Sequence, residues 1–165
     1  YAGLMIDRDG APKVIEFNVR FGDPETQPIM MRLQSDLVEL IEAALTGRLR
    51  DIHLLWDPRP AIGVVMAAHG YPGKVRGGDP ISGLDLAMAD VKVFHAGTRL
   101  RDGQVVSAGG RVLTVCALGA DLPAARERAY TALSKIHFDG GFHRRDIGHR
   151  ALARGGESEI GNREP

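Results

Sequence analysis

Apolar and polar positions alternate in two short runs at the start of the chain. Residues 1–7 and 13–18 both show this period of two, which is typical of β-strands with one apolar face. Between them lies Asp9-Gly10, a pair that favours a hairpin turn. We therefore predict a β-hairpin in whose second arm Glu16 and Asn18 point to the same face, because side chains alternate along a strand.

Two later segments have the apolar spacing of an amphipathic helix. The first would begin at Ser35 or Asp36, with Asp36 and Glu39 as a capping box, and would end at Gly47. The second would run from Asp121 to about His137. Their predicted apolar stripes are Leu37, Leu40, Ile41, Ala44 and Leu45 in the first helix, and Leu122, Ala125, Ala129, Leu133 and Ile136 in the second.

The remaining pattern divides the chain into two parts. Residues 48–60 are polar and contain two prolines, which indicates a boundary. After it, residues 61–68 form a near-continuous apolar run that predicts a strand buried on both faces. Further strands are predicted at 91–97, 104–107 and 111–118, with a hairpin turn at Arg101-Asp102-Gly103 and a short helix at Arg150–Arg154. Strands joined by hairpins and followed by a helix predict an antiparallel α+β fold.

Composition narrows the possible classes of function. Lysine plus arginine and aspartate plus glutamate both number 21, so bulk charge indicates no nucleic-acid partner. No apolar run approaches the roughly 18 residues of a membrane span, so we expect no membrane partner. The single cysteine, Cys116, excludes a disulfide within the chain and fits a reducing, cytoplasmic compartment. It lies inside an apolar run, and we interpret it as a core residue.

The chemistry of the first part centres on the run that follows residue 15. Glu16 and Asn18 offer a carboxylate and an amide oxygen, which suit a hard cation such as Mg²⁺ that completes its shell with water and phosphate. Arg20 could hold a phosphate or stabilise a transferring phosphoryl group. Gly22 permits close approach of a ligand, and Asp23 adds a polar contact. On spacing alone, a solvated face of an antiparallel sheet explains the pattern more simply than a metal site.

Other polar residues carry weaker signals. His69 and His95 could line a cleft, although a structural role is the commoner one for such histidines. Lys74 and Arg76, in a glycine-rich loop, could meet a substrate phosphate, but a solvated loop is the preferred interpretation. His143 and His149 do not have a zinc spacing, and we assign no zinc site.

One long motif points to a family. The run Glu16-Phe17-Asn18-Val19-Arg20-Phe21-Gly22-Asp23-Pro24-Glu25-Thr26-Gln27 resembles glycinamide ribonucleotide synthetases, also called phosphoribosylamine–glycine ligases. These are ATP-grasp enzymes of de novo purine synthesis. The similarity continues through residues 10–13, 35–38, 63–68, 70–73, 92–98, 109–113 and 146–151, so that it covers nearly all of residues 1–154.

The resemblance implies a reaction and roles for the residues. Glu16 and Asn18 would bind the Mg²⁺ (or Mn²⁺) that bridges the nucleotide phosphates, and Arg20 would be the catalytic and nucleotide-binding residue near the transferred phosphoryl group. Gly22 and Asp23 would contact substrate. ATP would phosphorylate glycine, and 5-phosphoribosylamine would attack the resulting glycyl phosphate, which gives glycinamide ribonucleotide, ADP and phosphate.

The resemblance also implies an organisation. Residues 1–58 would be the C-terminal portion of an ATP-grasp domain, residues 59–154 a C-terminal α+β domain, and residues 155–165 a disordered tail. The family's N-terminal substrate domain and mobile lid have no counterpart here, and the chain starts inside a predicted strand. We therefore expect a C-terminal fragment that is inactive without the missing N-terminal part.

Two alternatives remain open at this point. The chain could be a non-catalytic scaffold that binds nucleotide weakly or associates with a partner chain. It could also derive from a different ATP-grasp ligase, although the continuation from Gly22 to Thr26 argues against that.

Overall fold

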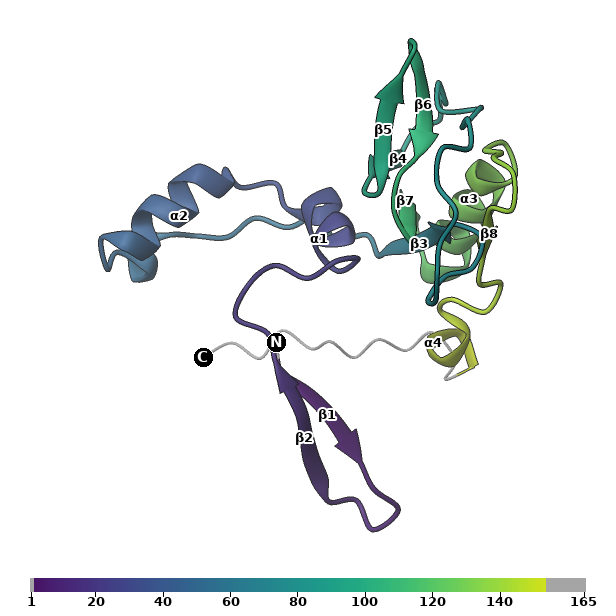
Figure 1. Cartoon of the computed structure of the whole chain (residues 1–165). Helices are drawn as coiled ribbons and strands as arrows, with labels where there is room; N and C mark the ends of the chain where they lie inside the picture. The colour runs from purple at the N-terminus through teal and green to yellow at the C-terminus, as the bar shows by residue number, and fades with distance from the viewer. Residues whose placement is uncertain (1, 154–165) are drawn as a thin grey trace.

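The computed structural model describes residues 2–153. Figure 1 shows a β-hairpin at the start of the chain that extends away from the rest, two helices that follow it, and a unit of sheet and helix formed by the second part of the chain. The predicted mixed fold with antiparallel pairing is confirmed. The predicted tail, residues 155–165, lies outside the described residues.

The hairpin consists of β1 (Ala2–Ile6) and β2 (Pro12–Phe17), which pair antiparallel as predicted. Residues 7–11 connect the two strands, so the connection is longer than a two-residue turn. The carboxylate of Asp7 stabilises it by accepting hydrogen bonds from the backbone amides of Asp9 (3.0 Å) and Ala11 (2.9 Å). The two strands form a sheet of their own, and every residue of β2 is exposed. The apolar side chains of β2 are therefore not covered by the rest of the described chain.

Helix α1 (Thr26–Arg32) was not predicted from the sequence. It packs against the main sheet, where the ring of Pro28 comes within 3.5 Å of the position that a Cβ on Gly63 would take. That distance is ordinary van der Waals contact, so α1 lies directly on the strand at Gly63.

Helix α2 (Leu37–Leu45) was predicted with nearly the observed bounds. The carboxylate of Asp36 accepts from the amide of Val38 at 2.7 Å, and the amide of Arg48 donates to Ala43 across Gly47, whose φ is +69°. Most of its apolar stripe lacks cover within the described residues, since the side chain of Leu45 is 82% exposed. Only Ala43 of this helix is buried.

The predicted boundary, residues 48–60, has more structure than its composition suggests. It contains a short 3-10 helix, η1 (Leu49–Asp51), and then returns alongside α1. The backbone amide of Gln34 donates to the carbonyl of Leu55 at 3.0 Å, and the amide of Asp57 donates to the carbonyl of Arg32 at 2.7 Å. The division of the chain at residue 58 stays a prediction.

The main sheet has the strand order β4-β7-β3-β8, and every neighbouring pair is antiparallel. Its members are β3 (Ala61–Ala67), β4 (Val91–His95), β7 (Arg111–Leu118) and β8 (Phe142–His143). Helices α1 and α3 both contact β3 and β7. All residues of β7 after Arg111 are buried, and β3 alternates between buried and half-buried positions.

Helix α3 (Leu122–Leu133) supplies one side of the core. Asp121 caps it by accepting from the amide of Ala124 at 2.8 Å, and four of the five predicted stripe residues are buried. The helix ends at Leu133 rather than near His137, because the backbones of His137 and Ser82 exchange two hydrogen bonds (2.9 and 3.2 Å). This pairing draws the chain away from the helix axis.

A second hairpin and a short helix complete the described chain. Strands β5 (Thr98–Arg101) and β6 (Gln104–Ser107) pair around Asp102 and Gly103, whose φ values of +49° and +77° are those of a type I′ turn. Helix α4 (His149–Ala153) lies where a terminal helix was predicted. Cys116 is buried in the core, as predicted. Within residues 2–153, the helices are all too short or too polar to cross a bilayer.

Candidate functional site

The candidate site begins at the end of β2. Glu16 lies opposite Gly3 on β1, and a Cβ on Gly3 would come within 3.2 Å of the Glu16 Cγ. The absent side chain at residue 3 thus leaves room for the Glu16 side chain over the neighbouring strand. Asn18 follows directly after the strand and is half-buried.

The strand ends at Phe17, one residue before the predicted end, and it contains a bulge opposite Gly3 and Leu4. Asn18 and Arg20 therefore lie beyond the last residue of the strand, and the shared face of Glu16 and Asn18 stays a prediction. Arg20 is exposed, and within residues 2–153 its guanidinium contacts only the carbonyl of Phe21, at 3.2 Å. Its charge remains available to a ligand.

The turn after Arg20 folds tightly before α1. The carbonyl of Gly22 accepts hydrogen bonds from the amide of Thr26 (3.0 Å) and from its hydroxyl. A Cβ on Gly22 would come within 2.8 Å of the carboxyl carbon of Glu25, so the glycine leaves room for that side chain to fold back across the turn. Gly22 itself is buried.

Asp23 connects this turn to the main sheet. Its Oδ1 accepts from Nε2 of Gln27 at 3.0 Å, and its Oδ2 lies 3.2 Å from Nη2 of Arg111, the first residue of β7. Both carboxylate oxygens are thus engaged by the chain itself. Sequence reasoning assigned Arg111 no role, because its partner lies far away in the sequence.

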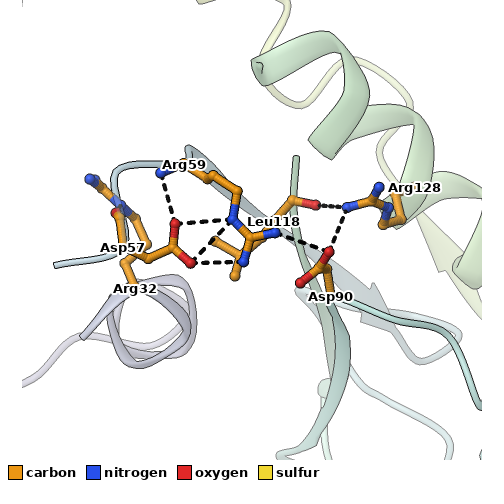
Figure 2. A network of polar contacts seen from close by, with 6 residues as sticks. All are labelled: Arg32, Asp57, Arg59, Asp90, Leu118 and Arg128. Atoms are coloured by element: carbon orange, nitrogen blue, oxygen red, sulfur yellow. Dashed lines mark hydrogen bonds and ion pairs between the residues drawn. The ribbon is translucent and has the colours of Figure 1, made fainter. Parts of the chain in front are cut away.

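A second network connects α1 to α3, and Figure 2 shows it from close by. The Arg59 guanidinium donates to both carboxylate oxygens of Asp57 and also contacts Asp90 at 3.0 Å. Arg128 reaches Asp90 at 3.3 Å and the carbonyl of Leu118, while Nε of Arg32 donates to the carbonyl of Asp57 at 3.1 Å. The contacts therefore run from the end of α1, past the strand ends at Arg59, Asp90 and Leu118, to α3.

The same network lowers the pKa of its buried acid, Asp57. Hydrogen bonds from the side chain and backbone of Arg59 lower the pKa of Asp57 to about 2. Asp57 is only 9% exposed, which fits its paired, charged state. Sequence reasoning missed both residues because they lie in the polar segment interpreted as a boundary.

Comparison with known proteins identifies the family. The family model described as "Phosphoribosylglycinamide synthetase, C domain" matches residues 61–150, which is more than half of the chain. The chain belongs to the phosphoribosylglycinamide synthetase family. The model of the family's ATP-grasp (A) domain matches residues 1–26. The family resemblance found in the sequence is thereby confirmed.

Individual relatives agree with this assignment. Proteins of Pseudomonas aeruginosa and Vibrio cholerae, both named phosphoribosylamine–glycine ligase, are 61% identical to the chain over 155 residues. The crystal structure of phosphoribosylamine–glycine ligase from Thermotoga maritima matches with a TM-score of 0.67 and 35% identity, over 88% of this chain and 35% of that one. The alignment covers 93% of the chain but only 36% of each of the two curated relatives. The chain thus spans about a third of their length.

Two of the other polar candidates of this phosphoribosylglycinamide synthetase chain, Arg76 and His95, have structural partners. Arg76 pairs with Asp79 at 2.9 Å and with Asp139, and these contacts raise its pKa. His95 lies 3.0 Å from the hydroxyl of Thr98 through Nδ1. His69 is exposed and packs beside Gly140, where a Cβ would come within 2.7 Å of the His69 Cβ.

The donor set at the end of β2 fits a divalent cation in chemical type. A carboxylate from Glu16 and an amide oxygen from Asn18 are hard oxygen ligands of the kind that Mg²⁺ or Mn²⁺ accepts. Residues 2–153 contain no cluster of three or more histidine, cysteine or acidic side chains able to hold a metal. Glu16 and Asn18 thus offer two of the oxygen ligands that such an ion needs.

Proposed function

We propose that the chain is the C-terminal part of an ATP-dependent ligase that joins glycine to 5-phosphoribosylamine. The observation that carries this proposal is the 61% identity over 155 residues to relatives named phosphoribosylamine–glycine ligase. That alignment covers both the run from Glu16 to Gln27 and the unit built on the main sheet. The alignment thus contains every residue that the sequence singled out for chemistry.

In this proposal, Glu16 and Asn18 hold a Mg²⁺ or Mn²⁺ ion, which when bound offsets the negative charge of the nucleotide phosphates. Arg20 stabilises the phosphoryl group as it moves from ATP to the carboxylate of glycine. The amine of 5-phosphoribosylamine then attacks glycyl phosphate and expels phosphate. The chain's main contribution to either step is positioning and charge stabilisation.

Gly22 and Asp23 contribute to substrate binding mainly through their backbone. The carboxylate of Asp23 is engaged by Gln27 and Arg111 at 3.0 and 3.2 Å, which favours a role in fixing the turn. The buried Gly22 leaves space for Glu25 to fold back and keeps that turn compact. A fixed turn immediately after Arg20 limits where its guanidinium can reach.

We further propose that residues 1–58 complete an ATP-grasp domain and residues 59–154 form a separate C-terminal domain. The chain would then need the N-terminal two-thirds found in its relatives before it could act on substrate. The open edges and exposed apolar side chains of the β1–β2 hairpin support this, since such edges are normally covered or paired.

Growth complementation tests the proposal. A fusion, in which this chain replaces the matching 155 residues of the Pseudomonas aeruginosa relative, would be expressed in a bacterial strain that lacks its own phosphoribosylamine–glycine ligase. We expect growth without added purine. The matched control is the same fusion with Glu16→Gln, which should be expressed equally and should not support growth.

A non-catalytic scaffold is the second candidate. The unit from β3 to β8 has a continuous buried core of its own, and none of the proposed metal or catalytic residues lies in it. If the fusion is folded and expressed but never restores growth, the scaffold becomes the better account of the chain.

A further inference from the structure

We propose that a cleft beside the β5–β6 hairpin binds the phosphate group of a small phosphomonoester. The cleft has a volume of about 420 Å³. It is lined by Val75, Gly77 and Gly78, by residues of the β5–β6 hairpin that include Arg99 and Arg101, and by the segment 107–109. None of these residues belongs to the metal, catalytic or substrate site proposed above, so the inference stands independently of the ligase function.

Two guanidinium groups give the cleft its charge. Arg99 and Arg101 are two residues apart on β5, so they lie on the same face of the strand. Within residues 2–153, the Arg99 side chain has no hydrogen-bond or ion-pair partner. Arg101 has only a long contact of 3.8 Å with Asp102, and both side chains of that pair are largely exposed. Neither arginine is thus committed to a structural interaction.

Glycines also line the cleft. Gly78 has a φ of +93°, and a Cβ placed there would lie 3.7 Å from Nη1 of Arg101. The amide of Gly78 is used, since it donates to the carbonyl of Ser107 at 2.6 Å. In the described part of the chain, the amides of Gly77 and Gly109 donate to no protein acceptor. Amides of glycines in such loops are typical partners of phosphate oxygens.

The half-buried Asp79 does not cancel this charge. Asp79 follows the glycine loop and accepts a hydrogen bond from the hydroxyl of Ser107 at 3.3 Å. Its carboxylate is paired with Arg76 at 2.9 Å, and its side chain is only 14% exposed. Arg76 also pairs with Asp139 and does not line the cleft. The lining of the cleft remains positive.

A phosphomonoester matches this combination of groups. It carries about −1.5 to −2 charges at neutral pH and has three acceptor oxygens. Guanidinium groups can hold such oxygens in pairs, and free amides can take the remainder. Inorganic phosphate and a phosphorylated metabolite share this chemistry, so the experiment must separate them.

The test is an NMR titration of the ¹⁵N-labelled chain with ribose 5-phosphate, with inorganic phosphate and with ribose. We expect saturable shifts of the Gly77, Gly78 and Gly109 amides with both phosphates and none with ribose. Tighter binding of ribose 5-phosphate than of phosphate would show that the sugar is also contacted. Equal binding would show that the phosphate group alone is recognised. Affinity should fall below about pH 6, where the phosphate loses its second charge.

Variants make the test specific. The double variant Arg99→Gln/Arg101→Gln should bind at least about tenfold more weakly, because two charge-assisted contacts are removed. Arg50→Gln, which removes an exposed arginine of η1 outside the cleft, should bind like the unmodified chain. An unchanged thermal midpoint would show that the double variant is folded. Shifts that do not saturate, or that persist in the double variant, would overturn the proposal.

Discussion

The Asp23 carboxylate lies 3.2 Å from the Arg111 guanidinium, although the two residues are 88 positions apart in sequence. Asp23 belongs to the turn after the proposed catalytic arginine, and Arg111 begins the buried central strand β7. The contact therefore links the turn of the candidate site to a strand that is buried along nearly its whole length. Both side chains are partly exposed, so we expect the contact to position the turn rather than to add much to the free energy of unfolding.

Loss of the Asp23–Arg111 contact should change activity more than stability. We expect Arg111→Gln and Asp23→Asn each to lower turnover of the fusion, while a double-mutant cycle on thermal unfolding gives a coupling of only about 0.2–1 kcal/mol. Arg111→Lys should restore part of the turnover, because it keeps the charge. Wild-type turnover in both single variants would contradict this positioning role.

Glu16→Gln and Asn18→Ala should abolish magnesium-dependent turnover of the fusion and leave its fold intact. Removing a metal ligand should lower the rate by about two orders of magnitude or more, because the charge on the phosphates is then no longer offset. Binding of Mn²⁺ measured by electron paramagnetic resonance should weaken in parallel, while the circular dichroism spectrum stays the same. Near-normal activity in both variants would refute the metal assignment.

The Asp57–Arg59 pair should make stability depend on pH in a defined window. Hydrogen bonds from Arg59 lower the pKa of Asp57 in the folded chain from 3.8 to about 2. The unfolded chain therefore binds the proton more readily, and the stabilisation is complete above about pH 4 and lost as the pH falls through 2. Urea unfolding between pH 5 and pH 2 should show a shallower loss of stability in Asp57→Asn.

Arg59→Gln should reproduce that shallower slope, because Arg59 causes the shift. The slope should not vanish in either variant, since a contact with Arg144 also lowers the pKa of Asp146 to about 2. An unaltered slope in both variants would show that the Asp57–Arg59 pair does not control acid stability.

The core on α3 should be sensitive to cavities. Leu133 is 1% exposed and packs in the main hydrophobic cluster, so Leu133→Ala should lower the free energy of unfolding by about 2–5 kcal/mol. Leu100, which is 70% exposed on β5, provides the matched control. Leu100→Ala should change the free energy of unfolding by less than about 0.5 kcal/mol. Similar effects of the two substitutions in urea denaturation would refute the assignment of the core.

Cys116 should report on unfolding rather than take part in chemistry. It is fully buried, and desolvation raises the pKa of its thiol to about 12. The folded chain should therefore react very slowly with Ellman's reagent, and the rate should rise sharply across the urea transition. Fast labelling of the native chain would mean that this side of the sheet opens readily.

Local patterns predicted those elements whose stabilising contacts are also local. Asp121 and the spacing of Ala125, Ala129 and Leu133 predict α3, since cap and stripe both lie within the helix. Likewise, Asp102 and Gly103 predict the tight turn, because the required φ values depend on these two residues themselves.

The elements that the sequence did not predict depend on distant partners. Helix α1 has only seven residues with a proline among them, and it packs against β3 and β7, which lie far from it in the sequence. Arg111 and Arg59 gain their roles from Asp23 and from Asp90, which no pattern within one segment reveals. The Glu16–Asn18 motif was visible in the sequence, whereas the end of the strand at Phe17, which leaves Asn18 and Arg20 beyond it, was not.

The central claim is that this chain supplies the C-terminal part of a phosphoribosylamine–glycine ligase, and one measurement tests it most directly. Formation of glycinamide ribonucleotide and ADP would be followed with ATP, Mg²⁺, glycine and 5-phosphoribosylamine for this chain alone, for the N-terminal part of the Pseudomonas aeruginosa relative alone, and for the fusion of the two. The account predicts product from the fusion and none from either part alone. A folded fusion without activity would contradict it.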